Sequence, residues 1–290
     1  MNAAIILNEE AGHGKNLAER LSQFRDEKFS FDLFTTNDGY LDDTLKKIDH
    51  ENYGMLIAAG GDGTVSSVAG RAVRLGSIMG IIPAGTLNHF ARDAGIPLDM
   101  DEAMKVIKNG NTALVDTASV NDHIFLNNSS IGLYPKVVKK REKEMRFGGN
   151  KWTALFKAVL TVFKSVPRIK VTIKADGQTI ECKTPFVFIG NNDYKFDLFN
   201  LGRREGLRDG RLSIYYPTYE GRISYVRLIL KTLTGRLDQE ISFRILHNEE
   251  IMIYSDKKRL EVSLDGEVIK MNTPLFYKIN TKSLRLIIPG

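Results

Sequence analysis

The sequence predicts an α/β domain with a parallel sheet, followed by a mostly antiparallel β-sandwich. In the first part, apolar runs of strand length alternate with helix-like segments, which is typical of a parallel sheet covered by helices on both faces. After about Asp116, strand-like runs dominate, and no Pro-, Gly- or Ser-rich linker marks the change. We therefore expect domains at 1–116 and 117–290, with the option that the C-terminal segment packs back on the first domain.

The first domain is expected to contain strands that are joined by helices. Short apolar runs that end in polar or glycine residues predict buried strands, and these runs are 3–8, 29–36, 53–61 and 78–85. Apolar residues at helical spacing predict helices, over 16–24, 41–48, 64–75 and 101–110, with a short helix after Asn88.

The second domain begins with two runs that look like paired strands, 111–120 and 122–132. Helices are expected over 134–147, 151–166 and 219–233. The other strand-like runs are 168–183, 184–192, 210–217, 241–247, 250–256, 259–269, 275–280 and 284–290. Asp176-Gly177 is a hairpin signal inside the first of these, because this pair favours a two-residue turn.

Composition favours a globular protein without disulfides or membrane spans. Of the 290 residues, 42% are hydrophobic and 26% are charged, both ordinary values for a soluble domain. Cys182 is the single cysteine, so no internal disulfide can form. The first residues carry no basic segment before a short apolar run, so no signal peptide is expected. We expect a cytoplasmic protein.

Positive charge is concentrated in one part of the chain. The net charge is +6, and residues 134–170 contain eleven Lys or Arg against two Glu. Such a segment favours phosphates of nucleotides, nucleic acid or lipid headgroups. A solvated helix face is the alternative explanation.

The helix expected over 151–166 is amphipathic. Its apolar stripe has helical spacing and consists of Trp152, Leu155, Phe156, Val159, Leu160 and Phe163, with lysines beside it. The stripe could pack on the sandwich core, or the helix could lie at a bilayer surface. The helix could do both if one of its edges lined a lipid pocket while its lysines faced anionic headgroups.

The stretch AAGGDGTVSSVAG, residues 58–70, predicts an anion site. A strand that enters a helix through a glycine-rich turn presents unpaired amides and the positive end of the helix dipole. The glycines are expected to allow close approach and positive φ, and Asp62 or Thr64 is expected to cap the helix. An aspartate beside a phosphate suggests an intervening Mg²⁺. A tight turn with a capping aspartate is the alternative.

A second glycine turn follows the next strand, in PAGTLNHFARDAGIP, residues 83–97. Parallel strands that are neighbours would bring both turns to the carboxyl edge of the sheet, where ligands bind in open α/β folds. Neither turn has the spacing of a P-loop or of GxGxxG.

These two motifs resemble the diacylglycerol kinase catalytic family, which includes the sphingosine kinases and small bacterial lipid kinases. The resemblance covers nearly the whole chain. It implies an ATP- and Mg²⁺-dependent kinase that phosphorylates a lipid hydroxyl in a cleft between a nucleotide domain of the NAD kinase and phosphofructokinase type and a C-terminal β-sandwich. By position it implies a nucleotide site made of Asn8, Thr35, Gly60, Gly61, Asp62, Gly63, Thr64, Val65, Ser66, Gly85, Thr86 and Asn88. After Asn8 the family's proline is missing.

The resemblance also implies catalytic acids. The segment SLDGEVI offers Asp265 and Glu267, and a carboxylate is suited to accept the proton of an acceptor hydroxyl. Glu267 is favoured as the base, with Asp265 second and Asp62 on the nucleotide side. Strand alternation would place both side chains on one face. A plain Asp-Gly hairpin turn is the alternative.

REGLRDGRLSIYY resembles a family motif that holds a structural Mg²⁺. By position it implies Asp209 with the carbonyls of Gly206 and Arg211, an oxygen set suited to a hard cation. A single carboxylate among arginines leaves open whether a cation occupies this site.

His89 stands where the commoner family pattern has aspartate; we expect it to line the cleft or cap a helix and not to act in catalysis.

Other functions remain open at this point. NAD kinases share the GGDGT turn, so a kinase of a soluble substrate is the main alternative, and a non-catalytic nucleotide- or lipid-binding protein of this fold is the other. No nucleic-acid module is recognisable. The expected partner is a lipid substrate at the inner face of a membrane. The sequence identifies neither the lipid nor the oligomeric state, although an exposed strand edge could form a homodimer.

Overall fold

The computed structural model describes residues 2–11, 17–26, 29–37, 40–48, 53–132, 168–197, 200–204, 206–217 and 243–290. The helices expected over 134–147, 151–166 and 219–233, and with them the predicted amphipathic helix, lie outside these residues. The chain forms two compact units. The first comprises Met1–Asn127, Gly206–Gly210 and Asn280–Gly290, and the second comprises Asn128–Glu205 and Arg211–Ile279. The first unit thus continues beyond residue 116 and includes the C-terminal segment.

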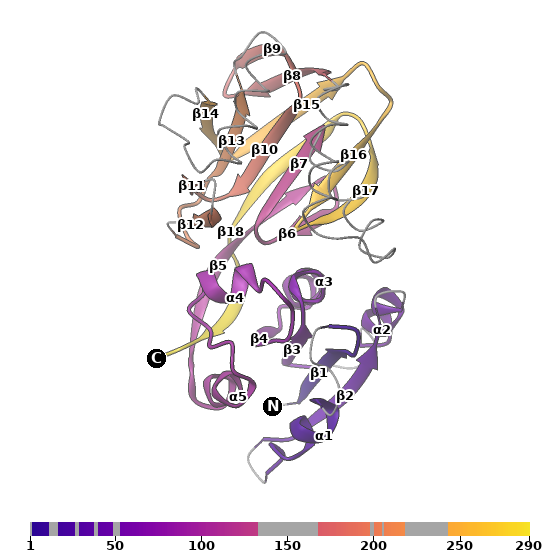
Figure 1. Ribbon diagram of the computed structural model, residues 1–290, viewed down its shortest axis with the longest axis vertical. Helices are drawn as coiled ribbons and strands as arrows, with labels where there is room; N and C mark the ends of the chain where they lie inside the picture. The colour runs from indigo at the N-terminus through magenta and orange to yellow at the C-terminus, as the bar shows by residue number, and fades with distance from the viewer. Residues whose placement is uncertain are drawn as a thin grey trace, which may run out of the picture. The chain divides into compact units, whose positions relative to one another are not determined.

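A parallel sheet forms the centre of the first unit (Figure 1), as the sequence predicts. Its strand order is β2-β1-β3-β4. The strands are β1 (Ala3–Asn8), β2 (Phe31–Thr36), β3 (Met55–Gly60) and β4 (Ile78–Pro83). Every residue of β1 and β3 is buried, which is why these strands are almost continuously apolar.

The helices of the first unit follow the strands in alternation. They are α1 (Leu17–Ser22), α2 (Leu41–Ile48), α3 (Asp62–Leu75), α4 (His89–Asp93) and α5 (Met100–Asn109). Local signals fix their ends. The side chain of Asp99 caps α5 by accepting from the amides of Asp101 and Glu102, and α3 ends at Gly76 in the left-handed conformation, φ 67°.

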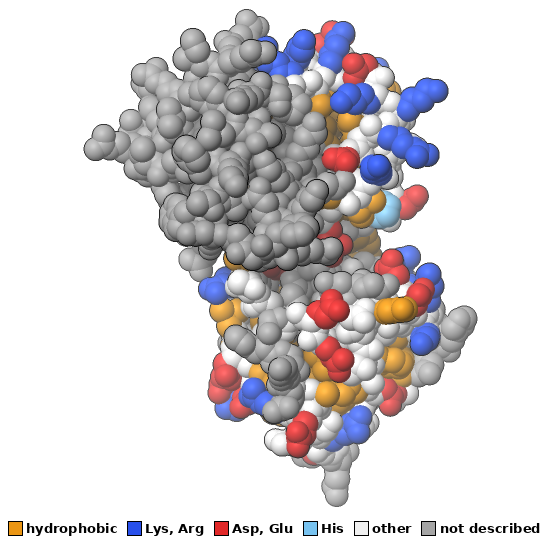
Figure 2. All heavy atoms as spheres, turned by 45° about the vertical axis from the view of Figure 1, so that its right-hand side comes forward, with side chains coloured by type: hydrophobic (Ala, Val, Ile, Leu, Met, Phe, Trp, Pro, Cys, Tyr) orange, Lys and Arg blue, Asp and Glu red, His pale blue; other side chains and the backbone are white. Residues whose placement is uncertain are grey.

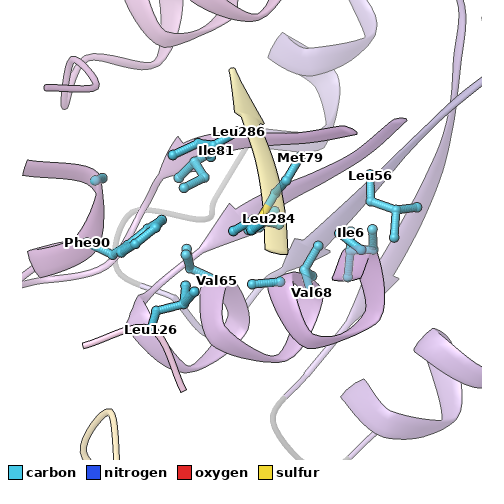
Figure 3. Close-up of a cluster of buried hydrophobic side chains, with 14 of the residues drawn as sticks. Ile6, Leu56, Val65, Val68, Met79, Ile81, Phe90, Leu126, Leu284 and Leu286 are labelled. Atoms are coloured by element: carbon cyan, nitrogen blue, oxygen red, sulfur yellow. The ribbon is translucent and has the colours of Figure 1, made fainter. Parts of the chain in front are cut away.

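Two apolar clusters cover the two faces of this sheet. On one face, Val65 and Val68 of α3 pack with Ile81, Leu284 and Leu286 (Figure 3). On the other face, Met104 and Ile107 of α5 belong to a cluster with Ile5 and Ile57. Helices therefore bury both faces, as expected for a parallel sheet.

The second unit consists mainly of antiparallel strands, as predicted. One sheet has the order β14-β13-β10-β7-β16-β17. Its strands are β7 (Asn128–Gly132), β10 (Phe186–Asn191), β13 (Leu212–Pro217), β14 (Phe243–Asn248), β16 (Arg259–Leu264) and β17 (Glu267–Asn272). The other antiparallel strands are β8 (Ile169–Ala175), β9 (Gln178–Thr184), β15 (Glu250–Ser255) and the start of β18 (Leu275–Ile288). A 3.0 Å hydrogen bond between the buried hydroxyls of Ser129 and Tyr277 joins β7 to β18.

The strand β18 contributes to both units. Leu275 pairs with Ile253 of β15, and Leu286 pairs in parallel with Met79 of β4. The two separate strands expected over 275–280 and 284–290 are therefore one strand. In the first unit β18 also pairs with β5 (Asn111–Val120), which pairs with β6 (His123–Phe125). A short hairpin of β11 (Tyr194–Asp197) and β12 (Asn200–Arg204) was not predicted.

Candidate active site

Four loops leave the parallel sheet at one level. In the strand register, Asn8 lies opposite Thr36, Leu7 opposite Ala59, and Gly60 opposite Pro83. The carboxyl ends of β1, β2, β3 and β4 thus form one edge. This is the edge at which open α/β sheets bind ligands, and the residues predicted for nucleotide binding lie at the ends of these strands or in the segments that follow them. Thr35 lies one residue before the end of β2 and is exposed.

The helix α3 begins at this edge with Asp62 as its first residue. Its N-cap is Gly61, with φ −85°, so neither Asp62 nor Thr64 occupies the capping position. The expected cap by Asp62 or Thr64 is therefore wrong. The Thr64 hydroxyl instead accepts a 3.1 Å hydrogen bond from the side-chain amide of Asn8, and both residues are buried. This bond fixes the start of α3 to the end of β1, and the dipole of α3 favours an anion at its start.

The glycines of the two turns serve close packing rather than unusual φ angles. Gly60, Gly61 and Gly63 are absent from the positive-φ residues, so the expectation of positive φ there is wrong. A Cβ at Gly60 would stand 2.6 Å from the Thr64 hydroxyl oxygen. A Cβ at Gly85 would stand 2.5 Å from the Cα atom of Gly61. The two turns therefore touch backbone to backbone, and neither Gly60 nor Gly85 has room for a side chain.

Asn88 holds the second turn in shape. It adopts the left-handed conformation, φ 51°, just before α4. Its side-chain oxygen accepts from the Gly85 amide at 3.0 Å, and its side-chain amide donates to the Gly85 carbonyl at 2.8 Å. The Ala84 amide also donates to the Gly60 carbonyl at 2.9 Å. The role visible for Asn88 is to position the turn.

The remaining predicted residues of this edge differ in accessibility. Asp62, Gly63 and Ser66 are half-buried, and Thr86 is exposed. The side chain of Val65 belongs to the apolar core, so any contact of this residue with a nucleotide would come from its backbone. His89 is the exposed first residue of α4. The expectation that it caps a helix is wrong, since the N-cap position belongs to Asn88.

Asp116 is a buried carboxylate that was absent from the predicted site. It is 1% exposed, and its two oxygens accept from the amides of Gly210 at 2.9 Å and Lys282 at 2.8 Å. Its own amide donates to the Leu207 carbonyl at 2.9 Å. Asp116 therefore fastens the segment 206–210 to β5 and β18. An aspartate at an inward position of an apolar strand was the signal that could have identified it.

The predicted metal residues are divided between the units. Asp209 lies against Gly206, since a Cβ at Gly206 would stand 2.6 Å from an Asp209 carboxylate oxygen. Arg211 belongs to the second unit, where its guanidinium binds the Asp193 carboxylate. Within the described residues, no group of three or more His, Cys, Asp or Glu side chains could hold a metal ion. A site here would depend on one carboxylate and on carbonyl oxygens.

The predicted acids Asp265 and Glu267 lie at the β16–β17 hairpin of the second unit. Asp265 and Gly266 form its two-residue turn, with φ angles of 47° and 94°, which matches a type I′ turn. The amide of Asn128 donates to an Asp265 carboxylate oxygen at 3.0 Å, and the Asp265 amide donates to the Asn128 carbonyl at 2.9 Å. Glu267 is exposed at the start of β17.

The strand-alternation argument for these two acids is wrong, because Asp265 lies in the turn and not in a strand. The hairpin turn that was the alternative explanation is present. It does not exclude a chemical role, because a tight turn can also present a carboxylate.

A cavity of about 830 Å³ in the second unit, next to the β8–β9 turn, is lined by none of the predicted site residues.

Comparisons with known proteins agree with this architecture. The family described as diacylglycerol kinase catalytic domain matches residues 2–120. A diacylglycerol kinase of Staphylococcus aureus is 31% identical over 75% of this chain and 69% of its own length. An uncharacterized protein of Synechocystis is 28% identical over 83% of this chain, and the match spans only 56% of that protein. A solved structure of a diacylglycerol kinase from Bacillus anthracis superimposes with a TM-score of 0.70 at 25% identity, covering 100% of this chain and 97% of the other.

Proposed function

Because this chain belongs to the diacylglycerol kinase family, we propose that it transfers the γ-phosphate of ATP to the hydroxyl group of a lipid. The observation that carries the proposal is the packing of Gly61 against Gly85 at the carboxyl edge of the sheet. Two turns without side chains meet there, beside the start of α3. This leaves backbone amides and a helix dipole as the groups that meet a ligand, which is suited to a chain of phosphates.

Asp62 is the proposed carboxylate on the nucleotide side. It is the first residue of α3 and half-buried. At the start of the helix, the Asp62 carboxylate would repel the phosphate oxygens of a bound nucleotide unless a cation lay between them. When bound with ATP, Mg²⁺ would neutralise charge on the phosphates. In the first unit, the Asp62 carboxylate would hold the Mg²⁺, and the amides of the two glycine turns would bind the phosphates.

The transfer needs one proton acceptor. The lipid hydroxyl oxygen forms a bond to the γ-phosphorus, the bond from that phosphorus to the β–γ bridging oxygen breaks, and ADP leaves. The hydroxyl proton passes to a carboxylate. Glu267 is the proposed acceptor, because its side chain is exposed at the start of β17. One Asp265 oxygen accepts the amide of Asn128. Asp265 would then orient the hairpin that carries Glu267.

Asp209 and Gly206 are the proposed residues of a structural cation site. Their proximity and the oxygen-only chemistry fit Mg²⁺ or Ca²⁺. Asp116 stabilises the segment 206–210, because its carboxylate accepts a hydrogen bond from the amide of Gly210. Loss of the cation would be expected to loosen the segment 206–210.

The proposed acceptor is a lipid alcohol reached at a bilayer surface, in the cytoplasm. No helix in the described part of the chain has the length and apolar character needed to cross a bilayer. We propose peripheral contact with the lipid. Diacylglycerol is the first acceptor to test, because the relative from Staphylococcus aureus carries that name.

The function is tested by phosphate transfer from labelled ATP with Mg²⁺. The purified protein receives mixed micelles that contain diacylglycerol or another lipid alcohol, and NAD in a parallel reaction. We expect label on a lipid and none on NAD, with transfer lost when Mg²⁺ is chelated. Label on NAD would replace the lipid kinase with a kinase of a soluble substrate. ATP binding without transfer to any acceptor would favour a non-catalytic member of the fold.

A further inference from the structure

One corner of the second unit carries five exposed lysines that form one surface. Figure 2 shows Lys and Arg side chains gathered on the described surface of this unit. We call the surface the β8–β15 basic face, and it consists of Lys170, Lys174, Lys183, Lys257 and Lys258. We propose that this face docks the protein on an anionic lipid bilayer. The choice of a bilayer rests on the proposed function, which requires contact with lipid.

The strand register places three of these lysines on one face of the sheet. Lys170 and Lys183 lie directly opposite each other in the antiparallel pair β8–β9. Lys170 and Lys174 alternate with buried Val171 and Ile173, so both project outward from the sheet. Like charges directly opposite one another destabilise a sheet. An external anion between them would remove that repulsion.

The turn after β15 brings the other two lysines to the same corner. Ser255 pairs with Val171, and its hydroxyl donates to the Lys170 carbonyl at 3.3 Å. Thr273 then holds the turn, since its hydroxyl donates to the Lys257 carbonyl at 2.7 Å and its amide to the Lys258 carbonyl at 3.1 Å. The backbone of this turn is thus fixed while both lysine side chains are exposed.

These lysines differ from others on the described surface. Lys46, Lys105 and Lys278 form ion pairs with Asp43, Glu102 and Glu250 at 3.1, 2.7 and 2.8 Å. Within the described residues, no lysine of the β8–β15 basic face forms an ion pair. Glu181 and Asp256 are exposed acids beside these lysines. Lys174 also shares the lining of a cavity with the exposed acids Asp176, Glu249 and Glu250. The positive charge of the face is therefore partly balanced, mainly around Lys174.

The chemistry of the face fits a bilayer. Tyr254 is 38% exposed, and the ammonium group of Lys174 lies 5.1 Å from the centre of its ring. Met252 lies opposite Lys174 in the register, and Phe276 lies opposite Met252. An amphipathic ring among lysines and partly buried apolar side chains matches the boundary of headgroups and acyl chains. A sheet face of this kind does not offer the helix or ribbon that enters a DNA groove.

Vesicle binding of charge-neutral variants tests the proposal. The variant combines Lys170→Gln, Lys183→Gln and Lys257→Gln, and its control combines Lys46→Gln, Lys47→Gln and Lys105→Gln in the first unit, which removes the same charge. Binding is measured by co-sedimentation with phosphatidylcholine vesicles with and without phosphatidylglycerol. Because each lysine near an anionic membrane contributes about a five-fold factor in partitioning, the triple variant should bind roughly 100-fold more weakly. The control should bind within about two-fold of the unchanged protein, and added salt should weaken the binding of both.

Equal binding of the variant and the control would overturn the proposal. Equal binding to vesicles with and without phosphatidylglycerol would also overturn it, as would binding to an oligonucleotide without binding to vesicles. Phosphate transfer in neutral detergent micelles is measured for the same proteins and should be unchanged, since none of these lysines belongs to the proposed active site. The transfer assay therefore separates the docking proposal from the proposed kinase activity. Lysine-dependent vesicle binding without any transfer would retain the docking face and reject the kinase, and transfer without lysine-dependent binding would do the reverse.

Discussion

Gly85 and Gly61 come from turns that follow different strands, yet a Cβ on Gly85 would stand 2.5 Å from the Cα atom of Gly61. Side-chain movement could not relieve that overlap, because the obstructing atom belongs to the backbone. The contact holds the GGDGT turn and the AGTLN turn in one arrangement at the edge of the sheet. The proposed phosphate site depends on this arrangement, because it brings the amides of both turns to one place.

Gly85→Ala should therefore separate the two turns. We expect a loss of roughly 1 to 3 kcal/mol in the free energy of unfolding, the usual cost of an added methyl group in a packed site. ATP affinity should fall by about ten-fold or more, since the amides of the two turns would no longer converge.

Gly70→Ala is the matched control. A Cβ at Gly70 would meet only a side-chain atom of Ile124 at 3.8 Å, which is ordinary contact distance. Since Gly70 lies inside α3, the change should stabilise the helix by roughly 0.5 to 1 kcal/mol. Denaturant unfolding and ATP titration of both variants check the prediction. Unchanged ATP affinity in the folded Gly85→Ala protein would contradict it.

Thr64→Val should destabilise the protein without changing the shape of residue 64. The change removes the buried acceptor that binds the side-chain amide of Asn8 at 3.1 Å. Loss of this bond should cost about 1 to 3 kcal/mol of unfolding free energy. Thr64→Ser retains the hydroxyl and should recover most of that cost. If the two variants unfold at the same denaturant concentration, the bond does not stabilise the start of α3.

Asp62→Asn should abolish most phosphate transfer and leave the fold intact. The N-cap of α3 is Gly61, so Asp62 does not occupy the capping position. A fall in kcat on the order of 100-fold is expected, the scale seen when one electrostatic stabiliser is removed. Asp42→Asn, an exposed first-turn aspartate of α2, is the control and should retain full activity. Full turnover of folded Asp62→Asn would reject its assigned role.

Glu267→Gln and Asp265→Asn together identify the proton acceptor. Asparagine tolerates the left-handed conformation of residue 265 and retains an oxygen that can accept the Asn128 amide. Both variants should therefore fold. We expect kcat to fall by about 100-fold or more in Glu267→Gln and by less in Asp265→Asn. The opposite order in a steady-state assay would assign the base to Asp265.

Arg211→Gln should alter the pH dependence of stability through Asp193. Burial alone would raise the pKa of Asp193, but hydrogen bonds from Arg211 and Ser213 and the charges of His247 and Arg211 lower that pKa overall. Since the folded pKa lies below the unfolded value of about 3.9, the carboxylate stabilises the fold above roughly pH 4. That contribution is lost as the pH falls through the folded pKa.

The partly exposed Arg211–Asp193 pair should contribute at most about 1 kcal/mol because solvent screens it. The difference in unfolding free energy between Arg211→Gln and the unchanged protein should therefore be largest above pH 4 and shrink at lower pH. Arg259→Gln is the control, since Arg259 donates to the neutral side chain of Asn272. Denaturant titrations above and below pH 4 check the prediction. A difference in unfolding free energy that did not change with pH would contradict the role given to the Arg211–Asp193 pair.

Much of the fold could be predicted because its signals are local. The apolar runs of β1 and β3 and the helical spacing of α3 are visible in single segments of sequence. Alternation of strands and helices then implies a parallel sheet and one carboxyl edge. The helix boundaries differed by one or two residues in α3 and α5, as expected where helix ends fray.

The sequence by itself therefore determined the α/β-then-β order, the family and the edge at which the candidate site lies. Only the tertiary structure decided how the site is held. Asn8 reaches Thr64 across 56 positions, Asp116 reaches Lys282 across 166, and Gly85 meets Gly61 through the backbone. Such bonds and contacts depend on distances between segments that no local pattern encodes, since they exist only after the sheet and its helices have packed.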